Sequence, residues 1–276
     1  MIEMSLELKK RVITAGVGAA ILLSLLILGG WVGAFCFVTV ISLGMIFEYT
    51  EITYSMGDRV EKRYFLLSLS WLVTLLNWLM PFHEFPFFMF FFMMLFGYFL
   101  WTAKRHMGNT LNTHFKELVY SIFGGAYLVF MPVYFLRIYE APSGVAWTIL
   151  FLLVNWAGDS AAYFVGKRYG KEKLYPEISP KKTREGALGG LAAGVLVACI
   201  YKFLFLRNLS LPGAVIMACL VGAIAQIGDL CESFFKRAFE MKDSGSILPG
   251  HGGFLDRFDG VIFSLPVMYA CVRLFG

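Results

Sequence analysis

Apolar runs long enough to cross a lipid bilayer recur along the whole 276-residue chain, and they constrain its fold more than any other feature. A run of about 18 or more apolar residues is typical of a transmembrane helix. Hydrophobic residues make up 58% of the chain, whereas soluble domains contain about 45–50%. The excess predicts an all-α, polytopic integral membrane protein with no sizeable soluble domain between its spans.

The apolar runs predict about nine transmembrane helices. Their expected ranges are 12–29, 31–53, 64–81, 84–103, 116–138, 144–166, 187–206, 211–235 and 254–275. The first run follows three basic residues, as in a signal peptide, but its length and the lack of a small-residue cleavage site predict a retained span. We expect an N-terminal helical membrane region at 1–140, with five spans. The other four spans and two polar loops form a second region at 141–276, in which we expect the chemistry.

Basic residues are distributed unevenly between the two sides of the predicted membrane segments. With nine spans, 20 of the 24 lysines and arginines fall on one side. Because Lys and Arg favour the cytoplasmic side, we expect a cytoplasmic N-terminus, a cytoplasmic (inner) membrane location and both polar loops facing the cytoplasm. The formal net charge of +5 then reflects orientation and contact with anionic lipid headgroups in the bilayer, and not binding of nucleic acid.

The first polar loop follows the sixth span. Pro176 and Pro180 interrupt any continuous helix there, which predicts an ordered loop. The run Ser179-Pro180-Lys181-Lys182-Thr183 offers two hydroxyls and two ammonium groups, which suits the oxygens of a polyphosphate. A plain positively charged cytoplasmic loop is the alternative for this segment.

Asp159 lies about two turns inside the cytoplasmic edge of the sixth span, which Lys167 marks. A carboxylate within the membrane costs about 2.5–3.5 kcal/mol on insertion scales. We therefore expect Asp159 to meet a cation, or a hydrogen-bond partner such as Asn155 or Ser160. In the next span, glycines recur at every fourth position, at Gly186, Gly190 and Gly194, a pattern that predicts close helix packing more than a phosphate site.

The stretch 226–259 holds the densest polar chemistry in the chain. Asp229 and Ser233 are four residues apart and share one helix face, and Asp256 and Asp259, three apart, share another. The loop between these spans can bring three aspartates together. Carboxylates so placed repel one another unless a cation lies between them, and hard oxygen ligands favour Mg²⁺.

Basic residues and glycines flank these aspartates. Lys236, Arg237, Lys242 and Arg257 would complement phosphate charge, and the glycines of 249–253 allow close approach to a ligand. A salt-bridge network without a ligand is the alternative. In the first half we expect Glu48 and Glu51 to be interfacial carboxylates near Arg59 and Lys62.

A set of positions with fixed spacing connects these residues: Ser233, Lys236, Arg237, Lys242, Asp243, Gly245, Pro249, Gly250, His251, Gly252, Gly253, Asp256, Arg257 and Asp259. This pattern resembles the signature of the phosphatidate cytidylyltransferases, or CDP-diacylglycerol synthases. Asp159 with Lys167, and the run from Ser179 to Gly186, resemble upstream motifs of the same family. The resemblance covers 155–270 and departs from many members at Gly260, where serine is usual.

The resemblance implies transfer of CMP from CTP to phosphatidic acid, which yields CDP-diacylglycerol and pyrophosphate with Mg²⁺ and room for a second cation. It implies that Asp229, Asp256 and Asp259 bind the metal. The implied catalytic residues are Asp229, Lys242, Asp243, His251, Asp256 and Asp259, with Asp243 and His251 positioning groups or relaying protons. The implied substrate-binding residues are Asp159, Lys167, Ser179, Lys182, Thr183, Ser233, Lys236, Arg237 and Arg257.

Two other functions stay open at this point. A CTP-dependent lipid-alcohol kinase would unite the same nucleotide, metal and membrane, and would release CDP in place of pyrophosphate. A transporter of anionic solutes would use the basic loops as a vestibule, although charge at one membrane edge and the lack of an inverted repeat speak against it. The Phe-rich first half also leaves room for a homodimer.

Overall fold

The computed structural model describes residues 16, 18, 20–80, 84–105, 110–245, 247 and 252–276. Helices dominate these residues, and seven are long and apolar enough to cross a membrane. Their bounds are Gly30–Thr53, Pro86–Arg105, Thr110–Glu140, Gly144–Tyr169, Arg184–Phe205, Leu211–Ala238 and Leu255–Phe275. They correspond to the second span predicted from the sequence and to the fourth through ninth. The prediction of a polytopic helical membrane protein is therefore confirmed.

The remaining two predicted spans have different outcomes. The third corresponds to α3 (Arg59–Leu79), which is helical over its whole length but is not among the seven apolar candidates. Charged side chains crowd the start of α3, at Arg59, Glu61, Lys62 and Arg63. The first predicted span lies partly outside the described residues. Within this span, residues 20–27 are helical. The cytoplasmic location of the N-terminus stays a prediction.

The chain forms two compact units. The first contains Met1–Val133 and Asp243–Asp256, and the second contains Tyr134–Lys242 and Arg257–Gly276. Both are built from two separate stretches of sequence, because the segment 243–256 belongs with the N-terminal helices. The division into functional regions at residue 140 stays a prediction.

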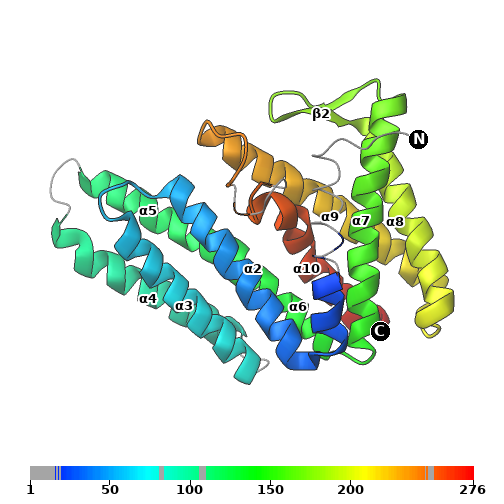
Figure 1. Ribbon diagram of the computed structural model, residues 1–276, viewed down its shortest axis with the longest axis horizontal. Coiled ribbons are helices and arrows are strands. Elements are labelled where there is room, and N and C mark those ends of the chain that lie inside the picture. Colours follow the sequence, from blue (N-terminus) through cyan, green and yellow to red (C-terminus); the bar gives the residue numbers. More distant parts are fainter. Residues whose placement is uncertain are drawn as a thin grey trace. The chain divides into compact units, whose positions relative to one another are not determined.

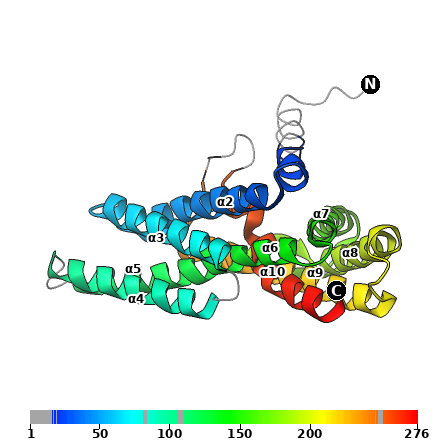
Figure 2. The same cartoon turned by 90° about the horizontal axis from the view of Figure 1, so that it is seen from below.

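The first unit contains α2 (Gly30–Thr53), α3, α4 (Glu84–Thr102), the short helix η1 (Ala103–Arg105) and α5 (Thr110–Gly125). Figure 2 shows α2 and α3 as one layer over α4 and α5. The layers pack closely where glycine permits it: a Cβ on Gly124 of α5 would lie 2.7 Å from Cε1 of Tyr49 on α2. The Tyr49 hydroxyl also donates a hydrogen bond to the Tyr120 carbonyl oxygen at 2.8 Å.

Two buried charged residues of the first unit, Lys62 and Glu117, pair with each other. The Lys62 ammonium forms ion pairs with Glu117 and with Asp58, the latter at 2.9 Å. The other Glu117 oxygen, Oε1, accepts a hydrogen bond from the Ser55 backbone N–H at 2.7 Å. Lys62 and Glu117 are both almost fully buried, so this cluster ties α3 to α5 inside the helical layers.

A wide helical turn, η2 (Ala126–Phe130), joins α5 to α6 (Met131–Glu140) without a break. Its π-helical geometry has a local cause in the sequence. Pro132 follows two residues later and has no backbone N–H to donate to the preceding turn. Insertion of a π-type turn accommodates such a gap while the helix continues.

The second unit is a group of helices, α7 (Gly144–Tyr169), α8 (Arg184–Phe205), α9 (Leu211–Ala238) and residues 257–275 of α10 (Leu255–Phe275). Figure 1 shows α7, α8 and α9 side by side. A Cβ on Gly186 would lie 2.7 Å from the Ala162 carbonyl oxygen, and one on Gly190 would lie 2.8 Å from that of Gly158. The glycines of α8 therefore allow backbone-to-backbone approach to α7, which confirms the predicted close packing.

A β-hairpin follows α7 (Figure 1) and corrects the all-α prediction in detail. Strands β1 (Lys173–Tyr175) and β2 (Ser179–Thr183) pair antiparallel, with Lys173 opposite Thr183. Pro180 lies within β2, a two-stranded edge position where its missing N–H is tolerated. The prolines thus exclude a helix here, as predicted, but the ordered loop takes the form of a hairpin.

Candidate active site

Four carboxylates form a cluster in the second unit, and three of them interact with the Lys182 side chain. Asp159 of α7, Asp229 and Glu232 of α9, and Asp259 of α10 form this carboxylate cluster. The Lys182 ammonium lies 2.6 Å from Oδ2 of Asp229. Asp159 interacts electrostatically with both of these residues, and Asp259 interacts with Asp229, Glu232 and Lys182. Residues up to 100 positions apart in sequence therefore share one electrostatic environment.

The β-hairpin and the start of α8 place Lys182 in the carboxylate cluster. The Thr183 hydroxyl oxygen accepts a hydrogen bond from the Gly186 backbone N–H at 3.1 Å and so caps the N-terminus of α8. Such a cap fixes the direction in which the chain enters the helix. Lys182, the residue before the cap, is consequently held at the hairpin–helix junction. Ser179, at the other end of β2, is half-buried.

Asn155 is one of the two hydrogen-bond partners considered for Asp159. The Asn155 amide donates instead to the Phe151 carbonyl oxygen at 2.9 Å, within its own helix. The electrostatic partners of Asp159 are Lys182 and Asp229, from β2 and α9. Of the alternatives for Asp159, the structure favours a charged neighbour.

Basic residues at the end of α9 extend this polar region. Lys236 pairs with Glu232 at 2.7 Å, one turn apart on the helix. The Arg237 guanidinium donates to the Met241 carbonyl oxygen at 3.1 Å, and its Nε donates to the Ile178 carbonyl oxygen of the hairpin at 3.5 Å. The C-terminus of α9 is thereby tied to the hairpin that carries Lys182.

The other predicted substrate-binding residues of the second unit lie near the surface, as does Lys242, which is predicted to be catalytic. Lys167, Arg257 and Lys242 are exposed, and Ser233 is half-buried. The Lys167 ammonium lies 5.8 Å from the centre of the Tyr163 ring, one turn earlier on α7. The predicted positions of these residues relative to a bound nucleotide stay predictions.

The segment 243–256 in the first unit carries two more predicted site residues that the structure describes. Asp243 is exposed. Asp256 accepts hydrogen bonds from the backbone N–H groups of Ser244 and Gly253, each at 3.0 Å to Oδ2. Gly252 adopts a left-handed φ of 82°, which favours glycine. His251 lies outside the described residues.

Glu48 is a polar residue whose role differs from the sequence expectation. Its side chain on α2 is buried, and its carboxylate accepts hydrogen bonds from the backbone N–H groups of Phe254 and Leu255, each at 3.0 Å. Glu51, one turn further on, pairs with Arg59 as expected and also with Arg63. The expected contact with a basic residue is therefore confirmed for Glu51, and exposure at an interface is wrong for Glu48, which is buried. A position of Glu51 at the membrane interface stays a prediction.

The sequence contains one feature that could have indicated a buried role for Glu48. Its neighbours Met45, Ile46 and Tyr49 are buried, so Glu48 interrupts an apolar stretch well before the charged loop begins. Glu232 was likewise not singled out from the sequence, although it lies between Asp229 and Lys236 on α9. A carboxylate inside an otherwise apolar helix usually has a partner or a function.

The chemistry of the carboxylate cluster suits a hard divalent cation. Among the described residues, no group of three or more His, Cys, Asp or Glu side chains is arranged as a ready-made metal site. Mg²⁺ requires less, because proteins usually bind it through one or two carboxylates together with water and substrate phosphates. Asp229 and Asp259, which interact with each other, supply such a donor set.

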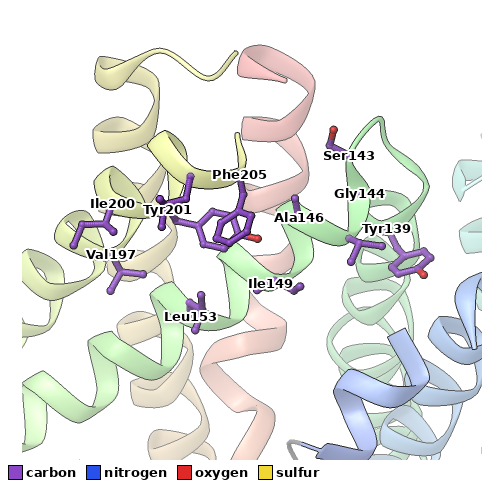
Figure 3. A pocket seen from close by; sticks show the side chains of 12 residues that line it. Tyr139, Ser143, Gly144, Ala146, Ile149, Leu153, Val197, Ile200, Tyr201 and Phe205 are labelled. Carbon is purple, nitrogen blue, oxygen red and sulfur yellow. The ribbon is translucent and has the colours of Figure 1, made fainter. Parts of the chain in front are cut away.

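An apolar cavity in the same unit has a different character. It measures about 840 Å³ and lies between α7 and α8, lined by residues such as Ile149, Leu153, Val197 and Ile200 (Figure 3). Its lining contains no Asp, Glu, Lys, Arg or His. It also lies near the start of α7 and the end of α8, the opposite ends of these helices from Asp159 and Lys182. Chemistry that needs charged side chains therefore suits the carboxylate cluster better than this cavity.

Comparison with known proteins identifies bacterial relatives that share one name. The chain is 39% identical over 163 residues to the phosphatidate cytidylyltransferase of Bacillus subtilis strain 168, a match that covers 59% of this chain and 61% of the relative. It is 45% identical over 145 residues to the phosphatidate cytidylyltransferase of Staphylococcus aureus strain COL, covering 51% and 55%. The chain thus spans about half to three fifths of the length of the curated relatives it matches.

A model of the cytidylyltransferase family matches residues 9–275. This match covers nearly the whole sequence, including the first half, for which the motifs gave no resemblance beyond helical spans. It also includes every residue of the carboxylate cluster and of the segment 243–256. The protein therefore belongs to the cytidylyltransferase family.

Proposed function

We propose that this protein is a phosphatidate cytidylyltransferase, which transfers CMP from CTP to phosphatidic acid and releases pyrophosphate. The observation that carries the proposal is the carboxylate cluster with Lys182 at its centre, built from three helices and a hairpin of a membrane protein in this family. Acidic and basic side chains in contact suit a reaction whose substrates and products are all phosphate anions.

The proposed reaction needs no nucleophile from the protein. A phosphate oxygen of phosphatidic acid attacks the α-phosphorus of CTP and forms a new P–O bond. The bond from that phosphorus to the oxygen bridging the α- and β-phosphates breaks, and pyrophosphate leaves. Both reactants are anions, so catalysis consists mainly of positioning and of neutralising charge.

Basic residues around the carboxylate cluster would bind the phosphates. Lys182 stands at the junction of β2 and α8, where the first N–H groups of the helix also favour an anion. Lys236 and Arg237, at the end of α9, extend the positive charge on the side that contacts the hairpin. Binding of CTP would exchange the Lys182–Asp229 ion pair for contacts of the Lys182 ammonium with phosphate oxygens.

Asp229 and Asp259 are the carboxylates that we assign to Mg²⁺. A bound Mg²⁺ would supply positive charge that neutralises the phosphates. Asp159 lies close enough to Asp229 to add negative charge to this environment. Asp256 keeps its predicted role in metal binding and catalysis as a prediction. Lys242, Asp243 and His251 likewise keep their predicted catalytic roles. The predicted roles in substrate binding stay with Lys167, Ser179, Thr183, Ser233 and Arg257.

A location at the membrane edge suits the two substrates. Phosphatidic acid lies in the bilayer and CTP in water, so the reacting phosphates must meet at the headgroup level. We place that edge on the cytoplasmic face of the inner membrane, which the distribution of Lys and Arg supports. A homodimer stays a prediction.

The test is pyrophosphate release by the purified protein in detergent with phosphatidic acid, CTP and MgCl₂, each omitted in turn. We expect release only when all three are present, with a CDP-linked lipid as the second product. Chelation by EDTA should stop the reaction and excess Mg²⁺ should restore it. Formation of CDP and a phosphorylated lipid alcohol would instead identify a kinase, and uptake of an anion by proteoliposomes without CTP would identify a transporter.

A further inference from the structure

We propose that Glu48 of α2 is a positioning residue, which anchors the base of the segment 243–256 and so sets the geometry of Asp256. The anchoring contacts are independent of the reaction; the consequence for turnover rests on the proposed function. Glu48 lies 196 residues before Ser244 and 207 before Leu255, and it belongs to none of the motifs in the second half of the chain.

The Glu48 carboxylate accepts three hydrogen bonds from this segment. Oε1 receives the Phe254 backbone N–H at 3.0 Å, and Oε2 receives that of Leu255 at 3.0 Å. The Ser244 hydroxyl lies 3.3 Å from Oε2 and donates the third. One carboxylate therefore holds residues from both ends of the segment.

Burial makes these contacts decisive for the position of the segment. The Glu48 residue is only 2% exposed, and a buried carboxylate is costly unless it is hydrogen-bonded. Two glycines allow the backbone to approach it. A Cβ on Gly245 would lie 2.7 Å from Glu48 Oε1, and one on Gly253 would overlap the Glu48 carboxylate and the Ser244 hydroxyl. The segment is thus shaped to fit around Glu48.

The Glu48 carboxylate accepts its backbone hydrogen bonds at the beginning of α10. The N–H groups of Phe254 and Leu255 lie at the start of this helix, where no carbonyl of a preceding turn can accept them. A carboxylate is the favoured acceptor there, because the N-terminus of a helix carries partial positive charge. Asp256 is the second residue of α10, so a shift of the start of the helix would move it.

Asp256 is a second carboxylate that accepts hydrogen bonds from both parts of the segment. It accepts the backbone N–H groups of Ser244 and Gly253, so Ser244 gives its hydroxyl to Glu48 and its N–H to Asp256. Two carboxylates thereby share one serine. If the Glu48 contacts are weakened, Ser244 should be held less tightly. The orientation of Asp256, which accepts the Ser244 N–H, should then change as well.

The variant Glu48→Gln tests the proposal with little change in shape. An amide keeps one acceptor oxygen but turns an N–H₂ donor toward groups that also donate. Loss of a residue that orients a metal-binding side chain typically costs about 10–100-fold in metal affinity or activity. We expect kcat/KM to fall by that range and the Mg²⁺ concentration for half-maximal activity to rise by a similar factor.

Hydrogen–deuterium exchange provides a readout that does not need turnover. The amides of Phe254 and Leu255 donate to Glu48, so peptides covering 252–256 should exchange faster in Glu48→Gln than in the unmodified protein. Ser244→Ala, which removes only the hydroxyl contact, should show smaller changes in the same direction. This milder variant serves if Glu48→Gln does not fold.

Glu51→Gln is the matched control, with the same chemical change one helical turn later on α2. Glu51 pairs with Arg59 and Arg63 and contacts no described residue of the segment 243–256 in these ion pairs. We expect its exchange at 252–256 and its Mg²⁺ dependence to match those of the unmodified protein.

Unchanged exchange at 252–256 in Glu48→Gln would overturn the anchoring role. Faster exchange with unchanged kcat/KM and unchanged Mg²⁺ dependence would overturn the positioning role and leave Glu48 a purely structural residue. If the unmodified protein releases no pyrophosphate, the proposed function fails, whereas the exchange data still decide whether Glu48 anchors the segment.

Discussion

The Lys182 ammonium lies 2.6 Å from Oδ2 of Asp229 and joins the hairpin after α7 to the middle of α9. These two residues come from different sequence motifs, one in each polar loop region of the second half of the chain. Their contact links a phosphate-binding group to a candidate metal ligand. The effect of substituting Asp229 can therefore be predicted from this contact.

Asp229→Asn should lower kcat by at least about 100-fold, the scale of losing one strong electrostatic contact to the reacting group. Asparagine is isosteric but neutral, so it weakens metal binding and removes the ion pair with Lys182. Pyrophosphate release under saturating CTP and phosphatidic acid measures the effect. Glu172→Gln is the control, because it breaks an exposed ion pair to Arg184 in the same hairpin region. Near-normal turnover in Asp229→Asn would contradict the metal assignment.

Gly190→Ala should destabilise the protein by about 1–3 kcal/mol, the usual cost of overpacking a close contact. A methyl group there would lie 2.8 Å from the Gly158 carbonyl oxygen, which belongs to the backbone of α7 and cannot move aside. Thermal unfolding in detergent should show a lower midpoint.

Gly97→Ala provides the comparison for that substitution. Gly97 is exposed on α4, and a Cβ added there meets nothing within 4 Å. Since alanine favours a helix over glycine by about 0.8–1.0 kcal/mol, we expect an unchanged or higher midpoint. An equal fall in both variants would argue against close packing of α7 and α8 as the cause.

Lys62→Met should destabilise the first unit by roughly 3–5 kcal/mol, because it leaves the buried Glu117 carboxylate without its ammonium partner. The double variant Lys62→Met/Glu117→Leu should recover much of that loss, since an apolar pair needs no desolvated charge. Breaking the exposed Arg105–Glu61 pair with Arg105→Ala should cost only about 0–1 kcal/mol. Chemical denaturation of the three variants measures the differences.

The predicted orientation can be tested at two exposed positions of the second unit. Glu177 lies between β1 and β2, and Asn208 lies between α8 and α9, at the other end of α8. In a cysteine-free background, we expect a membrane-impermeant maleimide to label Glu177→Cys only from the cytoplasmic side and Asn208→Cys only from the opposite side. Labelling of both from one side would refute a membrane-spanning α8.

Local sequence patterns predicted the features that depend on local chemistry. The spans followed from long apolar runs, and the contact between α7 and α8 followed from glycines at every fourth position. Asp159 was singled out because a carboxylate in an apolar helix needs a partner, and Asp229 because it shares a helix face with Ser233 and could converge with other aspartates. In each case one segment of sequence contained the whole physical reason.

Contacts between distant segments were the part that the sequence did not reveal. No local pattern indicates that Glu48 faces residues 244–255, because the hydrogen bonds go to backbone groups, which carry no signature of their own. Lys62 and Glu117 show the same difficulty, since their pairing depends on the packing of α3 against α5. The hairpin at 173–183 was also missed, because its two prolines indicated only that a helix was excluded.

The long sequence separation between Glu48 and its partners has a consequence for biogenesis. Chains emerge from the ribosome at roughly 5–20 residues per second, so on the order of 10–40 s pass between synthesis of Glu48 and of Leu255. During that interval α2 already exists, but the three groups that donate to its carboxylate do not. The Glu48 carboxylate of α2, which is synthesised early, thus acquires these hydrogen-bond donors only when the start of α10 has been synthesised. A chain truncated before residue 243 retains an uncompensated acid near the end of α2.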